Sequence, residues 1–164
     1  MSLNIESELQ KAKNKYKENK ILMEKLKRMK RKDIDKLFVN IHEEVFSEID
    51  CMECGNCCKA LGPKVNNRDI DRIGKFINMR AGKVRKNYLQ VDEDNDFIFQ
   101  SLPCPFLKEG NVCSVYEARP KACSEYPHTD MPNMQKKLHI TLKNSLICPG
   151  VSRILERVRE ELKK

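Results

Sequence analysis

The sequence of 164 residues contains no tryptophan, and aromatic residues make up only 6% of it. Apolar residues account for 40% and charged residues for 34%, so a single domain of this length has a modest hydrophobic core. No apolar run approaches the length of a membrane-spanning helix, and residues 1–13 lack the apolar core of a signal peptide. These absences predict a cytoplasmic protein that does not enter the membrane.

Glycine and proline are missing from the first part of the chain, where Gly55 and Pro63 are the first of each. The residues before them are rich in Leu, Lys, Glu and Met, which favour helix. Apolar residues recur there at helical spacing, with one polar member: Ile5, Leu9, Ala12, Tyr16, Asn19, Met23 and Leu26, then Ile34, Leu37, Phe38, Ile41 and Val45. The pattern predicts a helical extension over residues 1–49 with a coiled-coil-like first stripe. It is either one long helix or two with a break near Lys30–Asp33.

The net charge of +8 is concentrated in one segment. Residues 11–36 contain twelve Lys or Arg and four acidic residues. Such a run is most often a solvated helix face, and the alternative is that residues 1–36 bind an acidic protein partner or nucleic acid. Because Tyr16 is the one aromatic residue among these cations, base stacking is poorly supported. Nucleic acid is therefore the weaker of the two partner hypotheses.

Cysteine, by contrast, occurs eight times. Four cysteines form a burst with the spacing C-x2-C-x2-C-C and four follow at wide intervals: Cys51, Cys54, Cys57 and Cys58, then Cys104, Cys113, Cys123 and Cys148. Thiols two residues apart on a tight turn converge on one point, which suits a tetrahedral metal or a corner of an iron–sulfur cluster. All eight are therefore candidate ligands of a metal or cofactor. The alternative is a disulfide framework, which belongs to oxidising compartments.

Three interpretations of the metal site stay open. In the first, Cys51, Cys54 and Cys57 bind an iron–sulfur cluster, of the 4Fe-4S type, with a distal fourth ligand that precedes proline, as Cys104 and Cys148 both do. In the second, two four-cysteine sites hold zinc. In the third, one metal takes four cysteines and the others form a redox pair.

The adjacent pair Cys57–Cys58 is unusual for a single site, since adjacent side chains rarely point the same way. We therefore expect the two thiols to serve different sites or roles. Four positive side chains near the cysteines would offset thiolate charge, unless they are ordinary surface charges: Lys59, Lys64, Arg119 and Lys121. Arg119 either bonds to a cluster sulfide or an anionic substrate, or makes a structural contact with an acidic neighbour or a backbone carbonyl.

Residues 50–164 are predicted to form a small cysteine-rich metal-binding domain. A helix capped by Asn66 or Asn67 comes first. Hairpins follow with turns at Asp94–Asn95 and Glu109–Asn111, and the chain ends in a helix. Residues 136–147 are ambiguous between helix and strand. The predicted fold class is α+β, mostly helical with short hairpins, preceded by the long N-terminal helix.

No hydrolytic triad, P-loop or dinucleotide fingerprint occurs in the sequence, so enzymatic activity is neither predicted nor excluded. We expect a metal-binding protein with a structural, electron-transfer or metal-delivery role, and prefer an iron–sulfur cluster to zinc. One alternative is a metal-dependent enzyme that modifies protein, RNA or a cofactor. The other is a zinc-stapled protein that binds nucleic acid or a partner through its basic N-terminal helix.

Four motifs between residues 51 and 150, CMECGNCC, CPFL, CSVYEARPKACSEYP and CPG, resemble the CxxCxxCC cysteine-cluster family, which is described as zinc- or iron-chelating. The eight cysteines match its pattern, as do Tyr116, Arg119, Pro120, Tyr126 and Pro127. The resemblance implies metal chelation by these cysteines, and the basic N-terminal segment is not part of it. The family includes a flagellin lysine methylase. This chain has no recognisable S-adenosylmethionine motif, so that activity is not expected.

Overall fold

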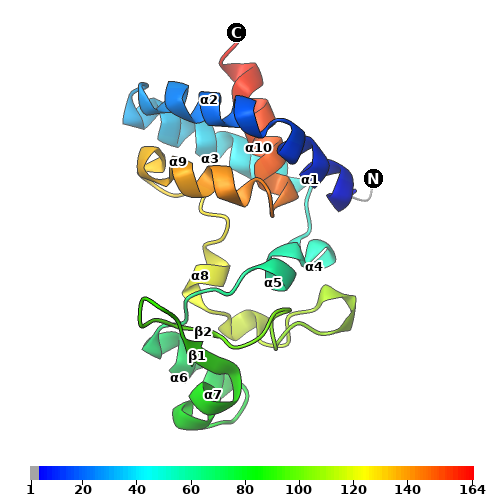
Figure 1. Cartoon of the computed structure of the whole chain (residues 1–164), viewed down its shortest axis with the longest axis vertical. Helices are drawn as coiled ribbons and strands as arrows, with labels where there is room; N and C mark the ends of the chain where they lie inside the picture. The colour runs from blue at the N-terminus through cyan, green and yellow to red at the C-terminus, as the bar shows by residue number, and fades with distance from the viewer. Residues whose placement is uncertain (1–3) are drawn as a thin grey trace. The chain divides into compact units, whose positions relative to one another are not determined.

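The structure is a computed structural model that describes residues 4–164. These residues form two compact units, the first made of residues 4–50 with Pro127–Lys164 and the second of Cys51–Tyr126 (Figure 1). The chain is mostly helical with one small antiparallel sheet, so the predicted α+β class is confirmed. The division into domains at residues 49 and 50 stays a prediction. The first boundary between the units lies beside it, at Asp50–Cys51.

The basic N-terminal segment forms three helices: α1 (Ile5–Asn14), α2 (Tyr16–Lys27) and α3 (Arg31–Ser47). The break between α2 and α3 ends at Lys30, whose backbone is extended with ψ of 134°, as the two-helix alternative with a break near Lys30–Asp33 predicted. The break at Lys15, whose ψ is 9°, was not predicted. It has a packing cause, because α1 contacts α10 (Pro149–Glu161) whereas α2 contacts α9 (Met134–Asn144), and a straight helix could not follow both partners.

Both ends of the chain build the core of the first unit. α3 packs against α9 and α10, and Figure 1 shows α2, α3 and α9 side by side. Five large side chains from these helices are fully buried, each favouring the folded state by about 1.5–3 kcal/mol through removal from water: Leu26, Ile34, Phe38, Leu138 and Leu155. Asn19, the polar member of the first stripe, is buried and accepts a hydrogen bond from Arg159 of α10. The predicted stripes therefore pack within this chain.

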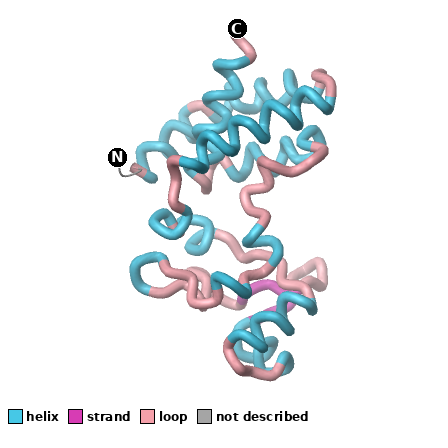
Figure 2. Tube along the Cα trace, turned by 180° about the vertical axis from the view of Figure 1, so that it is seen from behind, coloured by secondary structure: helices cyan, strands magenta, loops and turns pink. Residues whose placement is uncertain are grey.

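The second unit is a succession of short elements. It begins with α4 (Cys51–Cys54), α5 (Asn56–Ala60), α6 (Asn67–Phe76) and α7 (Ala81–Tyr88). β1 (Leu89–Val91) and β2 (Phe97–Phe99) pair antiparallel and are the magenta strands of Figure 2. The 3-10 turns η1 (Glu109–Asn111) and η2 (Tyr116–Ala118) and the helix α8 (Lys121–Ser124) complete it. The predicted turn at Asp94–Asn95 is confirmed, since Asn95 lies between the strands with a left-handed φ of 64°.

A separate hydrophobic core holds the second unit together. It joins α6 and α7 to the sheet and to the segment after β2: Val65, Ile70, Ile73, Val84, Leu89, Phe99, Phe106, Val115 and Ala118. The ring of Phe106 lies 4.6 Å from that of Tyr88 and 5.6 Å from that of Phe99, measured between centroids. Cys104 and Cys113 pack against this core. The apolar interior therefore positions two of the distal cysteines.

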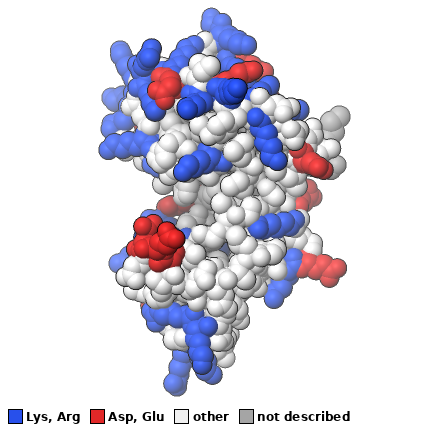
Figure 3. Space-filling view, in the orientation of Figure 1, with Lys and Arg blue, Asp and Glu red and all other residues white. Residues whose placement is uncertain are grey.

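The basic side chains of the N-terminal helices are mostly exposed, and Figure 3 shows blue atoms spread over the first unit. Three of them form ion pairs, each with a glutamate: Lys11 with Glu8, Lys15 with Glu156 and Lys27 with Glu24. Among the described residues, the nine others between residues 11 and 36 form no ion pair: Lys13, Lys17, Lys20, Lys25, Arg28, Lys30, Arg31, Lys32 and Lys36. Binding of an acidic partner here stays a prediction. No helix between residues 4 and 164 has the length and apolar character that crossing a bilayer requires.

Candidate metal centre

The cysteine burst folds into two short helical turns that meet at Gly55. This residue has a left-handed φ of 56°, and its N–H donates to the carbonyl of Cys51 over 2.9 Å. A Cβ at Gly55 would lie 2.7 Å from the Cβ of Asn111. The Asn111 side-chain amide donates to the carbonyl of Glu53 over 2.8 Å. Glycine therefore permits both the turn and the close approach that joins the burst to η1.

Replacing Gly55 with alanine is expected to destabilise the second unit by about 1–3 kcal/mol, because the left-handed φ and the contact with Asn111 both oppose a Cβ. Gly62→Ala is the matched control, since a Cβ there meets no heavy atom within 4 Å. Urea unfolding followed by circular dichroism measures both variants. Equal free energies of unfolding for the two would contradict this account of the turn.

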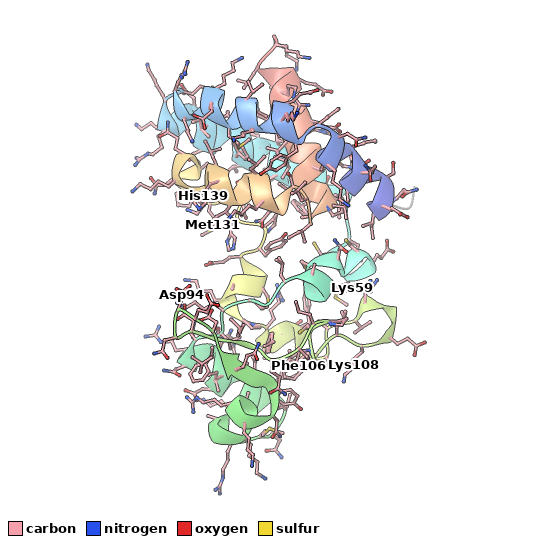
Figure 4. All side chains as sticks on the ribbon, viewed as in Figure 1. Lys59, Asp94, Phe106, Lys108, Met131 and His139 are labelled. Carbon is pink, nitrogen blue, oxygen red and sulfur yellow. The ribbon has the colours of Figure 1, made fainter. Side chains whose placement is uncertain are left out.

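The segment from Cys104 to Ser114 folds back on itself and brings two cysteines to its base. Leu107 and Cys113 form an antiparallel bridge, and the N–H of Ser114 donates to the carbonyl of Phe106 over 2.9 Å. Figure 4 labels Phe106 and Lys108 on this segment and Lys59 on α5. The N–H of Cys104 donates to the carbonyl of Cys58 over 2.8 Å. The last cysteine of the burst is thereby joined to the first distal cysteine.

Cys123 lies on α8, which Asp69 of α6 anchors. The Asp69 side chain is only 1% exposed, and its carboxylate accepts the backbone N–H groups of Lys121 and Asn66, each over 3.1 Å. It also accepts a hydrogen bond from Arg72 Nη2 over 2.6 Å. One carboxylate therefore binds the beginning of α6 to the beginning of α8.

Asp69 is a residue whose role the sequence analysis missed. It forms a capping box with Asn66, in which each side chain bonds to the other residue's backbone N–H. The sequence predicted the cap at Asn66 or Asn67, and an acid three residues after Asn66 is the signal that completes the box. Its third partner, Lys121, is remote in sequence, so the cap pattern could not reveal the link to α8.

The Cys58 thiolate acts on the ionisation of three other cysteines of the second unit. Burial, followed by the charges of the Cys58, Cys104 and Cys113 thiolates, raises the pKa of Cys123 to about 12. Burial also raises the pKa of Cys104 and that of Cys113, and in both cases the Cys58 thiolate adds to the rise. A bound cation would stabilise the thiolate forms of such a group.

Cys58 differs from the other three in its direction of shift. A hydrogen bond with the Cys57 thiol, with 4.0 Å between the sulfurs, lowers the pKa of Cys58 to about 7. Burial opposes this effect and the charge of Lys59 supports it. Cys58 is therefore the member of the group that ionises most readily.

Backbone N–H groups face two of the thiols, as metal-bound sulfur requires. Against the dominant effect of burial, hydrogen bonds from the N–H groups of Phe106 and Leu107 act to lower the pKa of Cys104. The N–H of Val115 does the same for Cys113. The fold-back segment therefore supplies both sulfur atoms and the donors that stabilise their charge.

Two of the four cations expected near the cysteines act on the thiols. Lys59 acts on Cys58, and the charge of Arg119 opposes the rise in the pKa of Cys113 and Cys123. The other two pair with acids, Lys64 with Asp96 at 2.7 Å and Lys121 with Glu125 at 3.4 Å.

Arg119 also makes a structural contact with a backbone carbonyl, which was one of the two roles predicted for it. Its Nη1 donates to the carbonyl of Tyr116 over 2.8 Å, and its guanidinium carbon lies 3.9 Å from the centroid of the Tyr116 ring. The expected contact with a backbone carbonyl is therefore confirmed. The guanidinium keeps further N–H groups for other partners.

The predicted ligands come from both units, since Cys148 begins α10 in the first and the other seven cysteines lie in the second. Within residues 4–164, no three His, Cys, Asp or Glu side chains lie close enough together to hold one metal ion. Binding would therefore require thiols to turn toward a common centre. The chemistry of the donors fits zinc or iron, because both take thiolate ligands. The eight-cysteine ligand set stays a prediction.

Five of the eight cysteines are thiols in the structure, so they give no support to the disulfide alternative. Cys54, Cys58, Cys104, Cys113 and Cys123 are thiols in the structure. Their half-buried positions suit ligands more than reactive surface groups.

Comparison with known proteins supports chelation. Neither a curated protein nor a solved structure matches the chain. Residues 50–149 match the model of the CxxCxxCC family, described as a "putative zinc- or iron-chelating domain". The match covers more than half of the 164 residues and contains all eight cysteines. The chain thus belongs to the CxxCxxCC family of zinc- or iron-chelating domains.

Proposed function

We propose that the second unit holds a metal centre on the thiolates of Cys58, Cys104, Cys113 and Cys123, and that the metal is iron in an iron–sulfur cluster. The hydrogen bond from Cys104 N–H to the carbonyl of Cys58 carries this proposal, because it joins the burst to the distal cysteines within one unit. The effect of the Cys58 thiolate on the pKa of each of the other three thiols supports the same grouping.

In this proposal Cys58, the fourth cysteine of the burst, is a metal ligand, although a simple C-x2-C-x2-C site does not need it. The remaining burst cysteines, Cys51, Cys54 and Cys57, then form a second group in the same unit. Their spacing is that of ferredoxin ligands, which favours iron over zinc for this second group and so for the chain as an iron-binding protein. The proposal adopts the expectation that Cys57 and Cys58 serve different sites, and their sulfurs, 4.0 Å apart, would then have to turn away from each other on binding.

An iron–sulfur cluster would supply one-electron transfer or structural cross-linking when bound. The chain's own groups would hold and tune it. The N–H groups of Phe106, Leu107 and Val115 would stabilise sulfur charge, and Lys59 and Arg119 would offset the net negative charge of the thiolates. Electron transfer, metal delivery and a structural role are all consistent with this arrangement.

Purification under anaerobic conditions tests the proposal. We expect iron and sulfide in the protein and broad absorption at about 400 nm from charge transfer between thiolate and iron. Elemental analysis for iron and zinc on the same sample identifies the metal. Zinc with no visible absorption would reject the cluster and keep the thiolate site. Absence of both metals from freshly prepared protein would reject the metal centre itself.

A further inference from the structure

A cleft of about 590 Å³, lined by polar and charged residues, opens in the second unit. Its walls come from the first turns of α6, from the residues before α8 and from α8 itself. Four cations line it: Arg68, Arg72, Arg119 and Lys121. Two carboxylates, Asp69 and Glu117, also line it, so the cations outnumber the acids by two.

The charged side chains that line the cleft differ in whether they already form ion pairs or hydrogen bonds within the protein. Asp69 is buried and bonded by three donors, one of which is Arg72, so this pair contributes little net field. Lys121 pairs with Glu125, but both are solvent-accessible and such a pair is weak. Within the described residues, Arg68 has neither an ion pair nor a side-chain hydrogen bond. Arg68 and Arg119 therefore offer guanidinium N–H groups to a ligand, and Glu117 is the one acid that opposes an anion.

We propose that this cleft binds a small phosphorylated molecule through Arg68 and Arg119. Two guanidinium groups from different segments can hold separate oxygens of a tetrahedral anion, whereas a planar carboxylate needs only one. Ser124 adds a hydroxyl to the lining. The volume lies in the range of small-molecule sites, about 300–1,000 Å³. The polar lining suits a phosphate group more than an apolar body.

The helix α8 connects the cleft to one of the proposed metal ligands. It contributes Lys121 and Ser124 to the cleft, and Cys123 lies between them in the sequence. Arg119 also lines the cleft, four residues before Cys123. A phosphate bound here would place negative charge on the same short segment as Cys123, and this link to the metal rests on the proposed function.

Calorimetric titration with inorganic pyrophosphate tests the proposal on the full chain at low ionic strength. We expect saturable binding that Arg68→Gln and Arg119→Gln each weaken by about tenfold or more, because each removes a charged donor pair. Arg68→Lys should restore part of the affinity. Lys86→Gln removes the same charge from an exposed position of the second unit outside the cleft, so its affinity should equal that of the parent protein.

Two results would overturn the cleft: no saturable binding by the parent protein, or equal losses in Arg68→Gln and Lys86→Gln. Arg68 is exposed and, among the described residues, makes no ion pair or side-chain hydrogen bond, so we expect Arg68→Gln to stay folded, and circular dichroism checks this. Metal content is measured on the same samples. If the protein carries metal but does not bind pyrophosphate, the proposal for the cleft fails and the metal centre stands. If it binds pyrophosphate but carries no metal, the proposed metal centre fails and the cleft stands.

Discussion

Cys58→Ser and Cys123→Ser are each expected to weaken metal binding by about a hundredfold or more. Structural zinc sites with four ligands bind with about 10–16 kcal/mol, so each thiolate accounts for roughly 3 kcal/mol, which is a factor of about one hundred. Because binding and folding are coupled, the melting temperature of the second unit should fall with the metal content. Elemental analysis and thermal unfolding of each purified variant measure the two effects.

Combining the substitutions tests which thiols share a centre. If Cys58 and Cys123 bind the same metal, the affinity loss of the double variant should be smaller than the product of the two single losses. Cys54→Ser should also lose metal and stability. Its loss should add to that of Cys58→Ser, because the proposal places Cys54 in the other group. Ser101→Ala, in an exposed loop of the same unit, is the control for handling and should keep its metal.

The opposite pattern is equally clear. A Cys58→Ser protein that stays folded with its full metal content would remove Cys58 from the ligand set. A second contrary outcome is additive metal loss for Cys58→Ser with Cys123→Ser, together with non-additive loss for Cys54→Ser with Cys58→Ser. That result would place Cys58 in the same group as Cys54. Either outcome would overturn the partition while leaving chelation itself intact.

Asp69→Ala is expected to destabilise the second unit by about 2–4 kcal/mol, because two backbone N–H groups lose their acceptor and α6 loses its capping box. Arg72 is partly exposed and can turn to water, so its share of the cost is smaller. The beginning of α8 loses its anchor to α6, so metal held by Cys123 should be lost as well. Urea unfolding and metal analysis measure the two consequences.

Asp71→Ala is the matched control for this substitution. Asp71 lies two residues further along α6 and is exposed. Its replacement by alanine changes the net charge by the same amount as Asp69→Ala. Asp69→Asn should be intermediate, since the amide keeps the volume and one acceptor oxygen. Equal stability of Asp69→Ala and Asp71→Ala would show that the three hydrogen bonds to Asp69 contribute little.

Local patterns in the sequence were sufficient for much of the fold. The turn at Asp94–Asn95 was predictable because the β-forming residues after it and the turn residues themselves are neighbours in the chain. The cap of α6 was predictable to within one residue, since capping depends on the few residues around Asn66. The apolar stripes correctly identified buried residues such as Phe38 and Leu26.

The partners of those elements were not predictable in the same way. The stripe that contains Asn19 suggested a coiled-coil seam, and in the structure Asn19 bonds to Arg159 near the other end of the chain. The break between α1 and α2 contains no glycine or proline, so no local signal predicted it, unlike the break near Lys30. It follows from the different helices against which α1 and α2 pack.

The sequence by itself determined that this chain is mainly helical and rich in candidate metal ligands, because residue type, helical spacing and the C-x2-C repeat are local properties. It also determined membership of the family, since that depends on the motifs alone. Only the tertiary structure decided three contacts: the Cys104 N–H donates to the Cys58 carbonyl, the Asp69 carboxylate accepts from the first residue of α8, and Arg119 lines a cleft rich in cations. Each of these joins residues far apart in the chain, and such contacts depend on how the core of Phe99 and Phe106 packs, not on any local pattern.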